Sequence, residues 1–147
     1  TLLSQFLPIT NDAIRAIADY IGKKATPNFI PHWDKETRWI YKSESARWKE
    51  ATAYAMSEKW EQAATRWKTI YETSSKWKEQ AKAASNLALY YEMSTQLKEA
   101  YEWALKSYML FKEHGGDAES QTGVQQLYVD ALSKRIQANL KLNKQFE

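Results

Sequence analysis

Two histidines, His32 and His114, are the only imidazole groups in this chain, and they lie far apart in the sequence. Metal-binding histidines on helices usually have a second ligand at close spacing, as in H-x3-H or E-x-x-H. Neither histidine has such a partner. We therefore interpret His32 as packing in a loop beside Trp33, and His114 as a residue near a helix C-terminus, where the helix dipole favours it.

Paired carboxylates could act as a general acid and base, and the chain has pairs such as Glu58/Glu61 and Glu99/Glu102. Their spacing is typical of the solvated face of a helix. Nucleophile-elbow and phosphate-loop motifs are absent, and Gly115-Gly116 is interpreted as a helix stop. Cysteine is also absent, which excludes disulfides, thiol nucleophiles and zinc thiolate sites. We predict no catalytic residue, no cofactor and no metal, and therefore not an enzyme.

A spacing of small and aromatic residues occurs twice, 37 residues apart. It consists of Ala51, Tyr54, Trp60 and Ala63, and then of Ala88, Tyr91, Leu97 and Ala100. A fixed offset of this length is typical of helical-hairpin repeats. The small residues would let two helices of a hairpin cross closely, with aromatic side chains filling the grooves beside the contact.

Composition supports a mainly all-α fold in a single domain spanning residues 1–147. Gly (4) and Pro (3) are scarce, whereas Trp (7) and Tyr (9) are abundant, and the mean hydropathy is −0.70. The net charge of +3 is spread along the chain, which argues against nucleic-acid binding. Apolar runs stay well below the roughly 20 residues that span a bilayer, so we expect no transmembrane segment. Because the chain begins at Thr1, we expect it to be a fragment of a longer chain.

Periodicity and capping signals divide the chain into helices and one interruption. Two prolines and several aromatics make residues 26–42 irregular, and we expect residues 37–41 to be extended. Phe29, Trp33, Trp39 and Tyr41 are predicted to plug one end of the helical stack. The expected helices are 12–24, 44–56, 60–72, 75–93, 97–113 and 118–143, the repeats being 44–73 and 75–113.

The last helix, near residues 118–143, is predicted to cap the stack. Its Lys-rich end would face water. The residues expected to cover the open end of the stack are Val124, Leu127, Tyr128, Ala131, Ile136 and Leu140.

The repeated positions resemble those of tetratricopeptide repeats (TPR). The second unit, from Asn86 to Ala100, is closest to the family pattern, and the first departs from it further. The Gly-Asp turn and the closing proline of that family are missing here, and the unit is longer. The resemblance implies a TPR-like right-handed array of antiparallel helical hairpins, an alpha-alpha superhelix, that binds a protein or peptide partner.

In that family, first-helix residues off the packing stripe line a concave groove. Carried over to this chain, the candidate partner-binding residues are Ser45, Trp48, Thr52, Met56, Lys82, Ser85, Leu89 and Met93. Trp48 and the two methionines would offer an adaptable apolar surface. The alternative is that the N-terminal segment or the last helix fills this groove.

A second resemblance rests on Pro31-His32-Trp33-x4-Arg38-x-x-Tyr41 followed by Trp48 and Ala63-x3-Trp67. This pattern is similar to a family of uncharacterised Bacteroidetes proteins that join an N-terminal sheet region to a TPR-like region. That family is often assigned to the cell envelope. The resemblance implies an envelope or periplasmic location and no mechanism.

Two functions from different classes follow. The favoured one is a non-enzymatic protein–protein interaction or scaffolding module. The alternative is a glycan-binding cell-envelope protein, because exposed Trp and Tyr side chains can stack on sugars. That alternative requires several aromatics on one exposed face, whereas the repeat spacing places most of them in the core.

The role of the small residues can be tested by enlarging them. We expect Ala63→Leu or Ala100→Leu to overpack a helix crossing and to lower the free energy of unfolding by about 1–3 kcal/mol. Thermal melting of each variant beside the unsubstituted chain measures this. A melting curve that neither substitution changes would contradict the assignment.

Overall fold

A computed structural model describes residues 6–8, 38–115 and 119–145, and it is mainly helical, as predicted. Two short strands accompany the helices in these ranges: β1 (Phe6–Pro8) and β2 (Trp39–Tyr41). The helices are α2 (Ala46–Met56), α3 (Trp60–Thr73), α4 (Trp77–Met93), α5 (Leu97–His114) and α6 (Glu119–Gln145). Their boundaries lie within about two residues of the predicted ones. The helix predicted at 12–24 and the proline-containing segment at 26–33 lie outside the described residues.

The extended segment predicted at residues 37–41 is confirmed at residues 39–41, which form β2. It pairs antiparallel with β1, with Leu7 opposite Ile40 and Phe6 opposite Tyr41. β2 also contacts α4. Tyr41 and Ile40 are buried, so the strand packs into the helical core.

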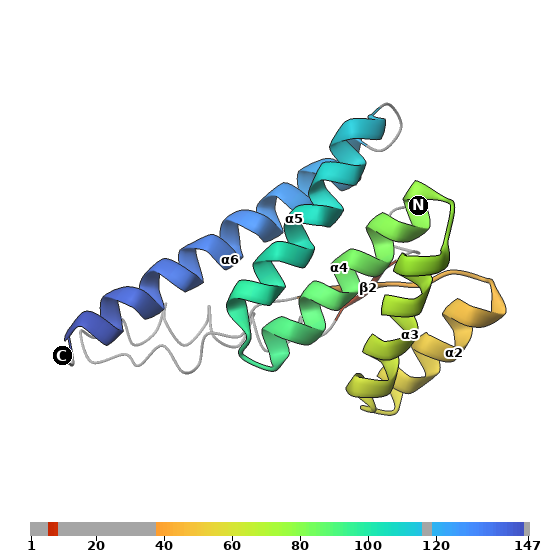
Figure 1. Cartoon of the computed structure of the whole chain (residues 1–147), viewed down its shortest axis with the longest axis horizontal. Coiled ribbons are helices and arrows are strands. Elements are labelled where there is room, and N and C mark those ends of the chain that lie inside the picture. The colour runs from red at the N-terminus through yellow and green to blue at the C-terminus, as the bar shows by residue number, and fades with distance from the viewer. Residues whose placement is uncertain (1–5, 9–37, 116–118, 146–147) are drawn as a thin grey trace, which may run out of the picture.

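The helices stack in chain order, each against the next (Figure 1). Connections of three residues join α2 to α3, α3 to α4 and α4 to α5. Such short connections make neighbouring helices antiparallel. Figure 1 shows α4 between α3 and α5, and α6 beside α5 and continuing past its N-terminal end.

The two hairpins share the same turn. Glu58 and Thr95, 37 residues apart, are both left-handed, with φ of 60° and 59°. In each turn the following residue donates its main-chain N–H to a tyrosine carbonyl five residues earlier (Lys59 to Tyr54, 2.8 Å; Gln96 to Tyr91, 2.9 Å). The sequence offset is therefore a structural repeat, even though neither left-handed residue is the glycine that such turns favour.

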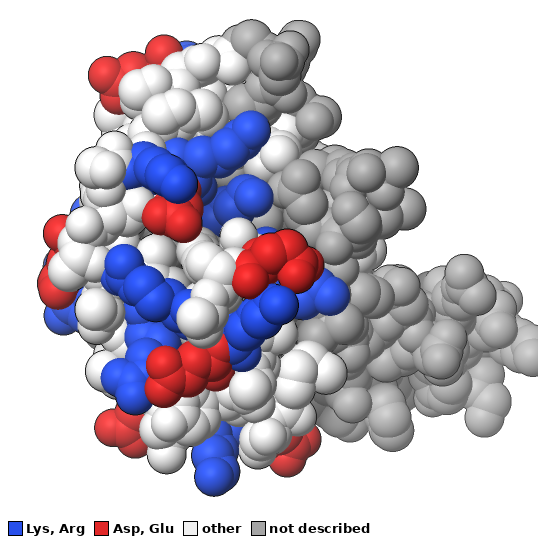
Figure 2. All heavy atoms as spheres, turned by 90° about the vertical axis from the view of Figure 1, so that its right-hand side faces the viewer, with Lys and Arg blue, Asp and Glu red and all other residues white. Residues whose placement is uncertain are grey.

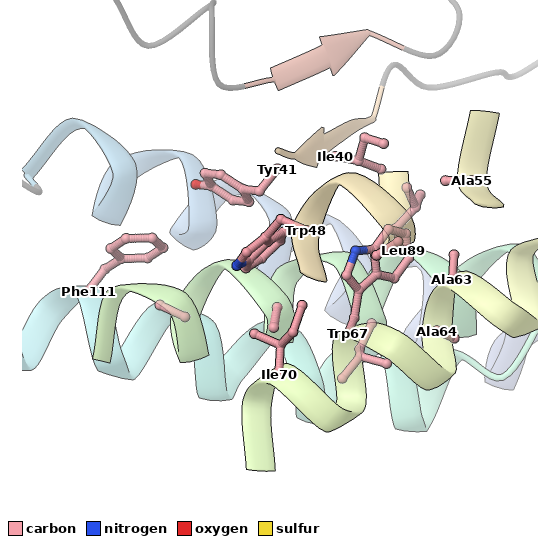
Figure 3. Close-up of a cluster of buried hydrophobic side chains, with 14 residues drawn as sticks. Ile40, Tyr41, Trp48, Ala55, Ala63, Ala64, Trp67, Ile70, Leu89 and Phe111 are labelled. Atoms are coloured by element: carbon pink, nitrogen blue, oxygen red, sulfur yellow. The ribbon is translucent and has the colours of Figure 1, made fainter. Parts of the chain in front are cut away.

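The main core lies between β2 and helices α2, α3, α4 and α5, and Figure 3 shows its members. Its largest fully buried side chains include Trp48, Trp67 and Tyr41. Ala63 and Ala100 are both completely buried, as expected of residues at close crossings. A second cluster holds α6 against α4 and α5 through Leu132, Leu97 and their neighbours.

The predicted packing face of α6 is confirmed in part, because Val124, Tyr128 and Ile136 are half-buried and pack on the two core clusters. Leu127 and Leu140, expected to cover the stack, are 72% and 57% exposed. Leu132 is buried instead, together with two glutamines, Gln121 and Gln125. The apolar pattern alone placed Leu127 and Leu140 on this face wrongly, because two of its buried positions are polar and α6 extends beyond the helix it packs on.

Candidate functional site

Among the described helices, α4 carries the most buried polar side chains. Ser85, Asn86 and Glu92 are all less than 10% exposed, and we call them the α4 polar face. The positions 37 residues earlier carry Trp48, Lys49 and Ala55, of which Trp48 and Ala55 are buried and Lys49 is exposed. The second repeat thus differs from the first by burying polar groups, and these groups need partners.

Asn86 holds β2 by its main chain. The main-chain N–H of Tyr41 donates to Asn86 Oδ1 at 2.7 Å, and Asn86 Nδ2 donates to the carbonyl oxygen of Tyr41 at 2.9 Å. Both atoms of the carboxamide are therefore used, and both main-chain polar atoms of Tyr41 are satisfied in the interior. A side chain that bonds both groups of one residue takes the place of a neighbouring strand.

The Tyr41 side chain is fixed from several helices. Its ring lies 6.2 Å from that of Phe111, and the Lys82 ammonium lies 5.8 Å from the ring centroid. Gln125 Nε2 donates to the Tyr41 hydroxyl at 3.4 Å and to Ser85 Oγ at 3.0 Å. Burial raises the pKa of the Tyr41 phenol far above its usual range, and burial also lowers the pKa of the Lys82 ammonium.

Glu92 is a buried carboxylate with partners from two other elements. Arg38, directly before β2, donates to both oxygens, from Nε at 2.8 Å and from Nη2 at 3.0 Å. The Tyr128 hydroxyl donates at 3.0 Å, and Arg135 donates from Nη1. The Arg38 guanidinium also lies 4.9 Å from the Tyr128 ring centroid. Bidentate arginine pairs of this kind combine strong hydrogen bonds with a fixed orientation.

These partners keep Glu92 ionised. Burial alone would raise the pKa of its carboxyl group, but the hydrogen bonds and charge of Arg38, with Tyr128 and Arg135, outweigh burial and hold the pKa below its usual range. Burial, followed by the charge of Glu92, raises the pKa of the Tyr128 phenol. The cluster is therefore a buried carboxylate that accepts hydrogen bonds from two arginines and a tyrosine, and it ties the segment at β2, α4 and α6 together.

The predicted groove residues differ in their exposure to solvent. Trp48, Ser85 and Leu89 are buried, whereas Thr52 and Lys82 are half-buried. In Figure 3 the Trp48 indole lies beside Tyr41 of β2. Along this stretch β2 contacts α4, through the bonds between Tyr41 and Asn86. Ser45, Met56 and Met93 are exposed.

The other candidate groups lie at the surface. Glu58, Glu61, Glu99 and Glu102 are all exposed. His114 ends α5 and stacks on Trp77, with 4.5 Å between the ring centroids. Within the described ranges, no three His, Cys, Asp or Glu side chains are grouped to hold a metal ion. None of the helices described is long and apolar enough to cross a membrane.

Sequence reasoning did not find the α4 polar face. Glu92 lies four residues after the packed Ala88, on the buried side of its helix, and this position was the available signal. Asn86 entered only as part of the TPR resemblance. Its partner is the main chain of Tyr41, 45 residues away. A main-chain partner cannot be recognised from the sequence, because every residue other than proline carries the same main-chain groups.

The chain belongs to a family described as "Domain of unknown function (DUF6340)", whose model matches residues 49–134. The matched part runs from α2 into α6 and contains Asn86, Glu92 and Tyr128. Arg38, Tyr41 and Arg135 lie just outside it. No curated protein and no solved structure matches the chain.

The Asn86 contacts predict a large loss of stability on truncation. Asn86→Ala would remove both of these hydrogen bonds from buried main-chain groups of Tyr41, and we expect the free energy of unfolding to fall by about 2–4 kcal/mol. Urea unfolding followed by tryptophan fluorescence measures this. Asn139→Ala, at an exposed position of α6, is the control. Equal losses in both variants would contradict the assigned role.

Glu92 predicts a pH dependence of stability. Because its pKa is lower in the folded than in the unfolded chain, its charge stabilises the fold above about pH 4.5, and this contribution is lost as the pH falls through the folded value. We expect Glu92→Gln to lower the free energy of unfolding by about 1–3 kcal/mol at pH 7. The difference should shrink progressively below pH 4.5 because the native carboxyl group becomes neutral too. Glu99→Gln, at an exposed glutamate, should show neither effect, and a pH-independent loss in Glu92→Gln would count against the ion pair.

Proposed function

We propose that this protein is a non-enzymatic interaction module that holds extended protein segments on the inner face of a TPR-like helical array. The observation that carries the proposal is the binding of the segment at β2 to α4. Asn86 binds main-chain atoms, and Glu92 binds an arginine side chain of the same segment. Helical-repeat arrays commonly use such inner faces to bind extended partners.

The TPR-like arrangement is itself part of the proposal. It is supported by the two hairpins with the same turn, by the stacking in chain order and by the buried alanines at equivalent positions. The Bacteroidetes envelope origin stays a prediction from the sequence.

The stretch of this face that is open to a partner lies at the hairpin ends. Met56 and Met93 occupy equivalent positions at the last residues of α2 and α4, and they are 60% and 46% exposed. Methionine is flexible and polarizable, so it packs against partners of different shape. A repeated, exposed methionine fits a peptide-binding surface better than a sugar-binding one.

Aromatic exposure also favours protein binding over glycan binding. Among the described tryptophans, Trp48 and Trp67 are buried, and Trp39, Trp60, Trp77 and Trp103 are half-buried. Trp103 is additionally engaged, with Tyr71 edge-on at 4.9 Å and the Lys106 ammonium 4.1 Å from its ring. A sugar platform needs open aromatic faces on one surface.

Surface charge fits a protein partner as well. On the face shown in Figure 2, Lys and Arg side chains alternate with Asp and Glu side chains. Nucleic-acid-binding proteins usually concentrate positive charge on their binding face.

The three methionines of the chain provide a direct test. Peptides selected from a displayed random 12-residue library on the intact protein would be titrated into protein labelled with ¹³C at the methionine methyl groups. We expect the Met56 and Met93 signals to shift and the Met109 signal to stay. The Met56→Glu/Met93→Glu double variant should bind about tenfold or more weakly.

Met109→Glu is the matched control, because Met109 is 57% exposed on α5. It should leave the affinity unchanged. Selected peptides that move no signal of Met56 or Met93, or that bind the double variant as well as the native chain, would overturn this surface.

A further inference from the structure

α6 carries a second apolar stripe that faces away from the stack. Leu127, Ala131, Ala138 and Leu142 follow each other at spacings of four, seven and four, which places them along one side of the helix. Leu127 is 72% exposed and Leu142 is 51% exposed. A hollow of about 450 Å³ lies on the first part of the stripe, lined by Leu127, Asp130, Ala131, Lys134, Arg135 and Ala138. We call this surface the outer stripe of α6.

Positive charge borders the outer stripe. Lys134 and Lys141 lie seven and fourteen residues after Leu127, so they project from the same side of the helix, and both are exposed. After Asp130 the rest of α6 contains no acidic residue. Arg135 is held by Glu92, which leaves the two lysines as the cations directed outward at the stripe.

The stripe has the length and the alternation of large and small side chains that suit the docking of a helix. From Leu127 to Leu142 it runs about 22 Å, or roughly four helical turns. Ala131 and Ala138, seven residues apart, would let a second helix approach closely between the larger leucines. Figure 1 shows that the C-terminal half of α6 continues past α5, so this part of the helix projects from the stack.

We propose that the outer stripe of α6 binds an acidic amphipathic helix of a partner protein. The apolar side of that helix lies on Leu127, Ala131, Ala138 and Leu142, and its flanking carboxylates pair with Lys134 and Lys141. Opposite charges at the edges of a helix pair select the partner and its orientation.

Charge and side-chain size argue against two other occupants. A second copy of this chain packed on the stripe would bring Lys134 and Lys141 of both copies together, and like charges at an interface oppose association. Membrane-surface helices bury large apolar residues such as Trp, Phe and Leu. Half of this stripe is alanine, which gives little depth for insertion into lipid.

The absence of cysteine allows a site-specific test. Ala138→Cys in the full chain would be labelled with an environment-sensitive fluorophore. The probe is a 21-residue peptide with Leu at heptad positions a and d and Glu at e and g, and its counterpart carries Lys in place of Glu. We expect the acidic peptide alone to shift the emission to the blue, with an affinity that falls as salt rises.

Charge reversal locates the contact. Lys134→Glu/Lys141→Glu should weaken binding of the acidic peptide about tenfold or more, because attraction becomes repulsion. Lys98→Glu/Lys112→Glu makes the same change at exposed residues of α5 and should leave binding unchanged.

Equal binding of both peptides, or equal weakening by both double variants, would overturn the proposal. A blue shift with vesicles of anionic phosphatidylglycerol but not with the peptide would also overturn it, in favour of lipid. A shift without peptide that grows with protein concentration would overturn it in favour of a second copy of this chain. A shift that is already complete without peptide at all concentrations would assign the stripe to another segment of this chain. Because Met56 and Met93 lie on other helices, each of these results leaves the proposed function standing.

Discussion

The burial of one negative charge, that of Glu92, constrains the arrangement of three elements. A carboxylate removed from water is costly unless cations and hydrogen-bond donors replace the lost solvation. Here the compensation comes from Arg38 before β2 and from Tyr128 and Arg135 on α6. Neither β2 nor α6 can leave α4 without removing part of this compensation. The ion pair therefore fixes the placement of the strand and the last helix, while apolar packing supplies the bulk of the buried surface.

The two repeats have the same hairpin backbone conformation, but they bury different kinds of side chain. The first hairpin packs with Trp48 and Ala55 at positions where the second has Ser85 and Glu92. Large and small apolar side chains need only a complementary shape, so the first unit can pack wherever volume allows. The polar groups of the second unit need partners in defined directions. Because of that requirement, the non-helical segment at β2 binds to α4. The same requirement gives a structural reason why the two units differ in sequence at these positions.

Periodicity in the sequence predicted the helices well, because each helix buries an apolar stripe and that stripe recurs in the sequence with a period of 3.6 residues. The extended segment at β2 also followed from its β-branched and aromatic residues. The α4 polar face did not follow, because Asn86 and Glu92 look like ordinary polar helix residues until their distant partners are known. The packing face of α6 was predicted only in part for the same reason: Val124, Tyr128 and Ile136 pack on the core as expected, but Gln121 and Gln125 are buried while Leu127 is exposed. Hydrophobic patterning locates elements, but it does not reveal a face whose burial depends on hydrogen bonds.

The bond between Asn86 and the Tyr41 amide has a consequence for how motion in this protein can be observed. Most strand amides exchange with solvent deuterium when the sheet frays, so their protection mixes strand–strand and strand–helix contacts. The Tyr41 amide is bonded to a side chain of α4. Its exchange therefore reports the opening between strand and helix separately from the opening of the sheet. The exchange rate of this single backbone proton thus reports how often β2 separates from α4.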